Sequence, residues 1–178
     1  MLGAITLKQL SSLSGFSVST VSKALNGRSD VNELTKAKIQ EIAKSKNYVP
    51  NNFARALRNR KTGIIAVILP EISESFCNIF LGETQKKAFQ KGYKLMFLQS
   101  SNCEKQEEEC LQVINDGSVD GVIVLSMSDE ITTLQLENKP FLKVHYKFDK
   151  NGYNEIQVRE TANFYFDKLI NKMNLHVT

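Results

Sequence analysis

The sequence is poor in the residues and motifs on which catalysis depends. Its 178 residues include two histidines, His145 and His176, and neither lies near a recognisable nucleophile. The glycine motifs that bind nucleotide phosphates, G-x-G-x-x-G and G-x-x-x-x-G-K, are both missing from the sequence. His145 ends an apolar segment and is more simply explained as a core residue than as a base. We therefore expect no enzyme and no cofactor.

Cysteine is also scarce. Cys77, Cys103 and Cys110 are odd in number, so they cannot all pair with one another, and the sequence contains no C-x-x-C motif. This count and spacing argue against a disulfide framework and against a zinc site. We expect Cys77 and Cys110 to be small apolar packing residues.

The sequence has no hydrophobic run long enough to span a membrane. Met1 to Ile5 do not resemble a signal peptide. With 42% hydrophobic and 24% charged residues, the composition is that of an ordinary soluble protein. The expected compartment is the cytoplasm.

Positive charge is concentrated toward the N-terminus. Residues 1–61 contain 11 Lys or Arg and 3 Asp or Glu, a net charge of +8, whereas the remaining 117 residues contain 12 and 16, a net charge of −4. A basic head on a slightly acidic body is typical of a nucleic-acid-binding domain joined to a sensing or assembly domain. The alternative is a solvated basic face without a partner.

A short helix is predicted to start after Thr6. Thr6 and Gln9 have the spacing of a capping box, in which each side chain accepts a hydrogen bond from the backbone N–H of the other residue. The helix is expected to run to about Ser14 and to bury three leucines, Leu7, Leu10 and Leu13. Gly15 then permits a sharp turn.

A second helix is predicted after this turn, with Ser17 as its cap. Its apolar side carries residues at three- and four-residue spacing, Val18, Val21 and Leu25. Its other side carries hydroxyl groups and one cation, Ser19, Thr20, Ser22 and Lys23, which suit phosphates and base edges. Two short helices joined by a glycine-containing turn indicate a helix-turn-helix, whose second helix enters the major groove of DNA. The alternative is a capped surface helix of any small domain.

A third helix, from about Asn32 to Lys46, is expected to close a small core. Its inward residues are predicted to be Leu34, Ile39, Ile42 and Ala43, with Phe16 and Tyr48 completing the core.

Two segments carry a resemblance to a known family. They are T-L-K-Q-L-S-S-L-S-G-F-S-V-S-T-V-S-K-A-L-N-G and Y-V-P-N-N-F-A-R-A-L-R-N-R-K-T-G-I-I-A-V-I-L-P, which resemble the start of a lactose-repressor (LacI) family transcription regulator. Ser11 and Ser14 depart from the family, which usually has alanine there. If these hydroxyl groups are buried, they need hydrogen-bond partners.

The resemblance implies a homodimer that binds a palindromic DNA operator, usually as a repressor. It implies that Val18, Ser19 and Lys23 face base edges, with Val18 suited to a thymine methyl. Residues implied to face phosphates are Ser17, Thr20, Ser22 and Asn26. The implied DNA-binding set also includes Thr6, Leu7, Asn51, Ala54, Arg55 and Leu57.

A hinge helix is expected after Pro50, from Asn51 to about Asn59. About ten residues are too few for a stable helix in water, so we expect it to form only when docked. By resemblance, two such helices pair in the minor groove, and Leu57 wedges between the central base pairs. The alternative is a linker with one apolar residue.

From Thr62 onward, apolar runs alternate with helical segments. Buried strands are predicted at 64–69, 93–98, 119–126 and 141–145, with helices at 76–91 and 104–116. Residues expected to face inward from these helices are Phe76, Phe80, Ala88, Phe89, Cys110, Leu111 and Ile114. The acidic run 107–109 is expected to form a solvated helix face. A further strand is predicted at 154–158 and a further helix at 160–173.

This alternation indicates an α/β fold with a parallel sheet and right-handed crossovers. It resembles the first part of the periplasmic-binding-protein fold that the family uses to sense effectors. The expected domains are an all-α helix-turn-helix headpiece at 1–49, a hinge helix or linker at 50–61 and an incomplete effector-sensing α/β domain at 62–178.

Ligands of open α/β sheets bind beyond the carboxyl ends of the strands. These ends are expected at 70–76, 99–102 and 126–128. The family places effector contacts at similar positions, so Ser73, Phe76 and Ser126 are candidate contacts for a small effector, most simply a carbohydrate that stacks on the Phe76 ring. The alternative is that these are ordinary loop residues.

The chain ends where the resemblance leads us to expect another strand, and R-E-T-A-N-F-Y-F replaces the family's acidic, glycine-containing approach to the last helix. We therefore expect a truncated regulator. One alternative is an interaction or dominant-negative fragment that pairs with a full-length regulator and lacks effector response. Another is a small-molecule-binding protein with a vestigial headpiece, against which the hinge pattern and the basic head argue.

Overall fold

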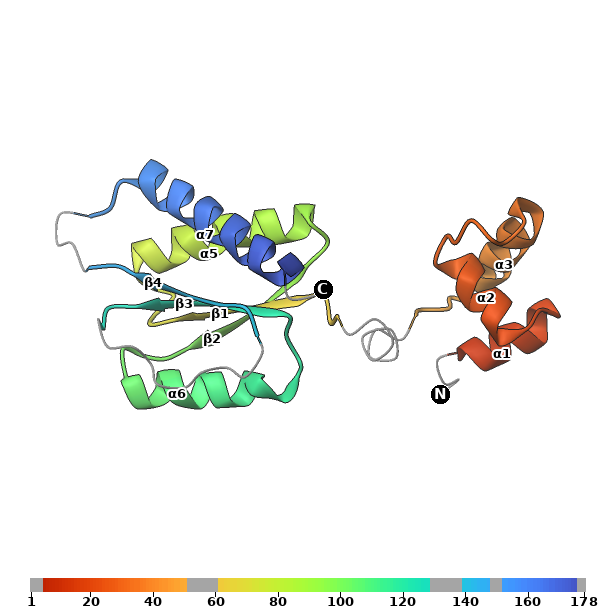
Figure 1. The fold of residues 1–178 in the computed structure, drawn as a ribbon, viewed down its shortest axis with the longest axis horizontal. Coiled ribbons are helices and arrows are strands. Elements are labelled where there is room, and N and C mark those ends of the chain that lie inside the picture. Colours follow the sequence, from red (N-terminus) through yellow and green to blue (C-terminus); the bar gives the residue numbers. More distant parts are fainter. Residues whose placement is uncertain (1–4, 51–60, 129–138, 148–151, 176–178) are drawn as a thin grey trace. The chain divides into compact units, whose positions relative to one another are not determined.

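The computed structural model describes residues 5–50, 61–128, 139–147 and 152–175. The chain forms two compact units, Met1–Arg55 and Ala56–Thr178, an N-terminal unit of helices and a C-terminal α/β unit (Figure 1). The predicted hinge helix falls on residues 51–60, outside the described residues.

The N-terminal unit contains α1 (Leu7–Ser14), α2 (Val18–Leu25) and α3 (Glu33–Ser45). All three predicted helices are present, within a residue or two of the expected bounds. They share one core, made of Leu10, Val21, Ala24, Val31, Ile39 and Ala43, with Phe16, Ile42 and Tyr48 packed against it. The predicted core therefore lacked Val31, which lies in the loop before α3.

Two leucines predicted to be buried lie on the surface. Leu13 is 53% exposed, because α1 turns the side that carries Leu10 and Ser14 toward the core and leaves Leu13 beyond its edge. Leu34 is 83% exposed in the first turn of α3, whose buried residues are Ile39 and Ala43.

Local hydrogen bonds define the ends of α1. Thr6 and Gln9 form the predicted capping box, and Gly15 ends the helix in the left-handed conformation with φ of 72°. The hydroxyls of Ser11 and Ser14 have partners: Ser11 Oγ donates to the Phe16 carbonyl (2.6 Å), and Ser14 Oγ donates to the Ser11 carbonyl (3.2 Å). Both serines thus stabilise the turn between α1 and α2.

The C-terminal unit is built on a parallel sheet of β1 (Ile64–Leu69), β2 (Lys94–Gln99), β3 (Gly121–Ser126) and β4 (Phe141–His145). The strand order is β2-β1-β3-β4, so β1 and β3 are central and are buried almost throughout. The predicted parallel α/β sheet is confirmed by the register, in which Val67 pairs with Phe97 on one side and Ile123 on the other.

Helices cover both faces of this sheet (Figure 1). One face carries α5 (Ser75–Gln90) and α7 (Glu155–Leu175), which pack against each other over a core centred on Phe80 and Phe166. The other carries α6 (Glu104–Val113) and the 3-10 turn Ile114–Asp116, which bury Leu111 and Ile114 against β1 and β3.

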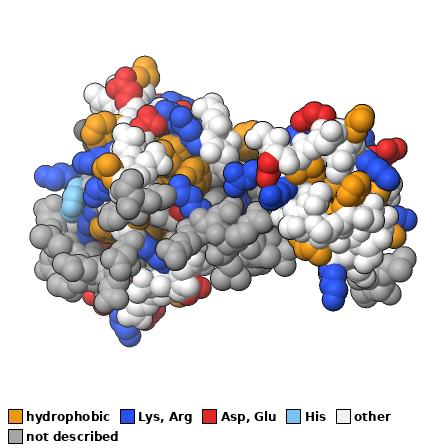
Figure 2. Space-filling model, turned by 45° about the vertical axis from the view of Figure 1, so that its right-hand side comes forward, with side chains coloured by type: hydrophobic (Ala, Val, Ile, Leu, Met, Phe, Trp, Pro, Cys, Tyr) orange, Lys and Arg blue, Asp and Glu red, His pale blue; other side chains and the backbone are white. Residues whose placement is uncertain are grey.

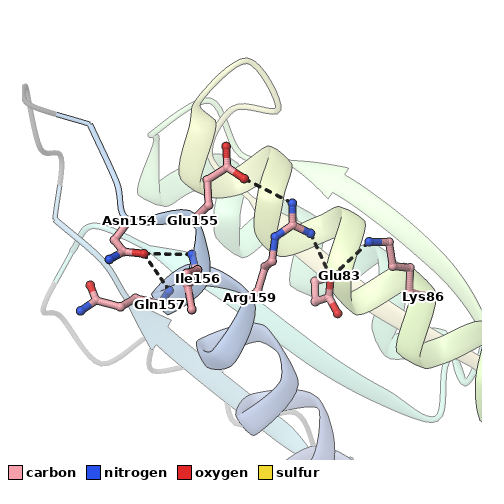
Figure 3. A network of polar contacts seen from close by, with 7 residues as sticks. All are labelled: Glu83, Lys86, Asn154, Glu155, Ile156, Gln157 and Arg159. Atoms are coloured by element: carbon pink, nitrogen blue, oxygen red, sulfur yellow. Dashed lines mark hydrogen bonds and ion pairs between the residues drawn. The ribbon is translucent and has the colours of Figure 1, made fainter.

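The segment 154–158 was predicted to be a strand, and this is wrong. Asn154 Oδ1 accepts hydrogen bonds from the backbone N–H groups of Ile156 (3.0 Å) and Gln157 (3.3 Å), as a helix cap does, and α7 starts at Glu155 (Figure 3). In the same region Arg159 of α7 lies between Glu83 of α5 (3.2 Å) and Glu155 (3.4 Å). The four-residue spacing of Glu155 and Arg159 places both side chains on one face of α7.

Three further predictions for side chains were wrong. Phe89, expected in the core, is 85% exposed in the last turn of α5. Glu107, expected in a solvated acidic run, is 7% exposed and pairs with Lys143 of β4 (3.4 Å). His145, expected in the core, is exposed at the end of β4.

In the described part of the chain, no helix is both long and apolar enough to cross a membrane.

Candidate nucleic-acid interface

Helix α2 has one packed side and one open side. Val21 and Ala24 are fully buried against the other two helices. Val18, which the apolar pattern also placed on the packed side, is 43% exposed, and Ser19 and Lys23 are exposed as well. Residues 18, 19 and 23, which the resemblance assigns to base edges, thus all lie at the surface of one helix.

Three hydroxyl groups gather at the N-terminus of α2. Ser17 Oγ caps the helix by accepting from the Thr20 N–H (3.1 Å), and it lies 2.8 Å from both Ser19 Oγ and Thr20 Oγ1. The helix dipole places positive potential at this end. Ser17 and Ser19 are exposed and Thr20 is half-buried. Hydroxyl donors beside a helix N-terminus make a suitable contact for a phosphate oxygen.

The remaining α2 positions are held by local bonds. Asn26 Nδ2 donates to the Ser22 carbonyl (2.6 Å), which orients the exposed amide at the end of the helix. Lys23 Nζ lies 2.6 Å from Asp30 Oδ2, in the loop that precedes α3. Asp30 was not among the predicted residues, because α2 ends at Leu25 and the pairing depends on the path of the loop that follows.

Thr6 and Leu7, at the start of α1, complete the described part of the predicted DNA-binding set. Thr6 is exposed, and its hydroxyl is already used in the capping box, at 2.9 Å from Gln9 Oε1. Leu7 is partly buried and packs against the shared core. Asn51, Ala54, Arg55 and Leu57 lie outside the described residues.

Positive side chains surround these helices. Lys8, Lys23, Arg28, Lys38, Lys44 and Lys46 are all exposed in the N-terminal unit. The face shown in Figure 2 carries several such side chains on this unit, in blue. Lys38 lies over the Phe16 ring at 5.7 Å from its centroid, so its ammonium stays close to the turn between α1 and α2.

A pocket of about 90 Å³ lies at the carboxyl ends of β1, β2 and β3. This is the edge at which a ligand was expected. Its lining residues are Pro70, Ser100, Asn102, Cys103, Glu104, Glu107, Ser126, Met127 and Ser128. Of the three predicted effector contacts, the lining includes Ser126.

Ser73 and Phe76 do not line this pocket. Ser73 is exposed, and its hydroxyl donates to Glu71 (3.0 Å). Phe76 is 7% exposed and stacks on Tyr146, with ring centroids 4.6 Å apart and planes 6° from parallel. Burial and bonds to Cys77 and Glu74 raise the pKa of Tyr146, so its hydroxyl stays protonated and donates to Glu74 (2.8 Å). The Phe76 ring therefore packs on neighbouring rings of the core and offers little surface to a ligand.

The two carboxylates of the pocket, Glu104 and Glu107, were not among the predicted effector contacts. Glu104 accepts a hydrogen bond from Ser128 Oγ (2.8 Å), and Glu107 pairs with Lys143 (3.4 Å). Both belong to the start of α6, which follows β2, and a helix that follows a parallel strand begins at the carboxyl edge of the sheet. That rule was available from the sequence and points to these residues. Among the described residues, no group of three or more His, Cys, Asp or Glu is placed to hold a metal ion.

Comparison with known proteins supports the assignment of these parts. Residues 6–51 match the family described as "Bacterial regulatory proteins, lacI family". The chain is 30% identical to the sucrose operon repressor of Streptococcus mutans over 158 residues, which cover 89% of this chain and 48% of the relative. It is 34% identical to the HTH-type transcriptional regulator RegA of Clostridium saccharobutylicum, covering 79% of this chain and 42% of the relative.

Solved structures show the same fold. A lac repressor dimer bound to operator and an anti-inducer matches with a TM-score of 0.72 at 20% identity, over 79% of this chain and 44% of that one. A LacI-family regulator from Silicibacter pomeroyi matches with a TM-score of 0.64 at 26% identity, over 84% of this chain and 45% of that one. The chain spans about half the length of the curated relatives it matches. Residues 6–51 thus form an N-terminal domain of the LacI family of bacterial regulatory proteins.

Proposed function

We propose that this chain acts in transcription regulation, most simply as a repressor, by binding a palindromic DNA operator as a homodimer. In this proposal the α/β unit binds a small effector, a sugar, at the carboxyl edge of its sheet. The observation that carries the proposal is the open side of α2, where Val18, Ser19 and Lys23 are exposed while Val21 and Ala24 hold the helix on its core.

The proposed contacts follow the placement of these side chains. Val18, Ser19 and Lys23 read base edges in the major groove, the first through a thymine methyl group. Ser17, Thr20, Ser22 and Asn26 bind phosphates, and Thr6 and Leu7 lie beside the backbone where α1 crosses it. Residues proposed for the minor groove, from the hinge prediction, are Asn51, Ala54, Arg55 and Leu57. The proposed headpiece is 1–49, the hinge 50–61 and the sensing domain 62–178.

The edge of the sheet supports dimerisation. Strand β2 pairs with β1 alone among the described strands, and its residues are mostly exposed or half-buried. Phe97, in the middle of β2, is 54% exposed. A second copy related by a two-fold axis would cover this strand, and the two headpieces would then meet a palindrome.

The pocket supports a polar effector. Ser100, Ser126 and Ser128 supply hydroxyl groups, and Glu104 supplies a carboxylate, which together can bond sugar hydroxyls. Its volume of about 90 Å³ is below the roughly 300 Å³ of typical ligand sites, so it accommodates part of a ligand, such as neighbouring hydroxyl groups. Relatives named as sucrose and ribose operon repressors favour a sugar.

The proposal is tested by measuring the mass of the protein in solution, alone and with a pool of random duplexes, followed by sequencing of the retained DNA. A dimer that enriches one palindrome supports the proposal and identifies the operator. A monomer whose DNA binding is sequence-blind contradicts it and favours the alternative of an interaction fragment. Thermal unfolding with and without a panel of sugars tests the effector, because a ligand of the folded state raises the unfolding temperature.

A further inference from the structure

The recognition helix has its cation restrained by an acidic residue from the following loop. Lys23, in the last turn of α2, and Asp30 lie 2.6 Å apart, with side chains 53% and 54% exposed. The loop returns to the helix through Gly27, whose φ is 69°, and through the Arg28 N–H, which donates to the Lys23 carbonyl (3.1 Å). The Lys23 backbone and side chain are thus both tied to this loop.

This pair lies on the surface that would face DNA. The hydrogen bond from Lys23 holds the pKa of the Asp30 carboxyl below its usual range, so the carboxylate is charged at neutral pH. An exposed ion pair is weak, and DNA phosphates compete for the same ammonium group. Asp30 therefore opposes any phosphate contact that Lys23 could make, and its own charge repels the DNA backbone.

We propose that Asp30 is a specificity-determining residue of the DNA-binding surface, because it positions the Lys23 ammonium and restrains it from phosphates. The inference rests on the proposed function. On a matching site the restrained ammonium meets an acceptor on a base edge, such as guanine O6 or N7, without leaving Asp30. On unrelated DNA, Lys23 must leave Asp30 to reach a phosphate, so this carboxylate weakens non-specific binding more than specific binding.

The test compares Asp30→Asn with a matched control, Glu33→Gln, in the full chain. Glu33 pairs with Lys36 on α3 (2.7 Å), so the control removes an equal charge and a similar ion pair away from Lys23. Dissociation constants are measured over a range of salt concentrations for the most enriched duplex and for a scrambled duplex of the same composition. Circular dichroism and thermal unfolding check the fold of each variant.

Asp30→Asn should bind the scrambled duplex about three- to fivefold more tightly than the wild type. The magnitude of its salt slope on that duplex should rise by about one, because a free Lys23 displaces one more counterion. The affinity for the enriched duplex should change less, so the specificity ratio falls. Glu33→Gln should leave both the ratio and the slope near the wild-type values.

A second background isolates the role of Lys23. In a Lys23→Gln chain, Asp30→Asn should lose most of its effect on the scrambled duplex, because only the repulsion between its own charge and the DNA backbone then remains. Equal effects of the two substitutions in the wild-type chain, or a full Asp30→Asn effect without Lys23, would overturn the inference and leave the proposed function standing. If the pool yields no enriched duplex and the wild type binds all DNA alike, the proposed function fails and the inference fails with it.

Discussion

The Asp120 carboxylate receives both the backbone N–H and the hydroxyl of Thr62, at 2.6 and 2.9 Å. Its second oxygen accepts the Gly63 N–H at 2.8 Å. These residues are 58 and 57 positions apart in sequence, and they join the start of β1 to the loop before β3. The carboxylate thereby fixes the start of β1 against the loop before β3.

Asp120→Ala should lower the free energy of unfolding of the α/β unit by about 2 kcal/mol, because three donors lose a charged acceptor. The chain contains no tryptophan, so chemical denaturation followed by far-ultraviolet circular dichroism measures the change. Asp116→Ala is the matched control, since Asp116 is exposed and its bonds are local, as in the bond from the Ser118 N–H (2.7 Å). Equal losses in both variants would show that the Thr62 contacts carry no special stability.

Leu57→Ala should weaken binding to the enriched duplex by about tenfold or more and leave binding to scrambled DNA nearly unchanged. The proposed wedge acts only where the duplex is kinked, and burying such a side chain is worth about 1.5–3 kcal/mol. Paired measurements of the dissociation constant on both duplexes give the answer. Similar losses on the two would argue against a wedge.

Lys143→Met should destabilise the α/β unit by about 3 kcal/mol, since the Glu107 carboxylate would be left buried without this cation. The side chains of Lys143 and Glu107 are 13% and 9% exposed. Adding Glu107→Leu in the same chain should recover much of the loss, because an apolar pair removes the buried charge. Urea unfolding of the two single variants and the double variant measures the coupling, and additive losses would contradict it.

The three thiols should react with iodoacetamide in a fixed order, Cys103 first and Cys77 last. Cys103 is exposed, Cys110 is half-buried and Cys77 is buried. Burial raises the pKa of the Cys77 and Cys110 thiols. A raised pKa lowers the thiolate fraction at any pH below it, so Cys77 should be at least about tenfold slower at pH 8. Peptide mass spectrometry over time measures each rate, and rapid labelling of Cys77 in the folded chain would show that its site opens.

Features that depend on neighbours in sequence were predicted correctly. The Thr6–Gln9 capping box and the turn at Gly15 involve residues within one helical turn, so their spacing is visible in the sequence. The apolar runs at β1 and β3 are buried on both faces, and the parallel sheet follows from their alternation with helices. The pocket edge followed in the same way, from the rule that ligands bind beyond the carboxyl ends of parallel strands.

Tertiary structure decided what distant residues impose on each other. An apolar side chain is buried only if another element covers it. Leu13, Leu34 and Phe89 fit a local apolar pattern, but in the described part of the chain they remain exposed. Glu107 is buried because Lys143 supplies a cation from β4, and α7 starts at Glu155 because Asn154 caps a helix that packs on α5. The sequence alone thus determined the family of the N-terminal domain, the order of most elements and the edge that holds the pocket. The Lys23–Asp30 pair and the Thr62–Asp120 contact arise only when the folded chain brings separated residues together, because a hydrogen bond or ion pair forms only within a few ångströms.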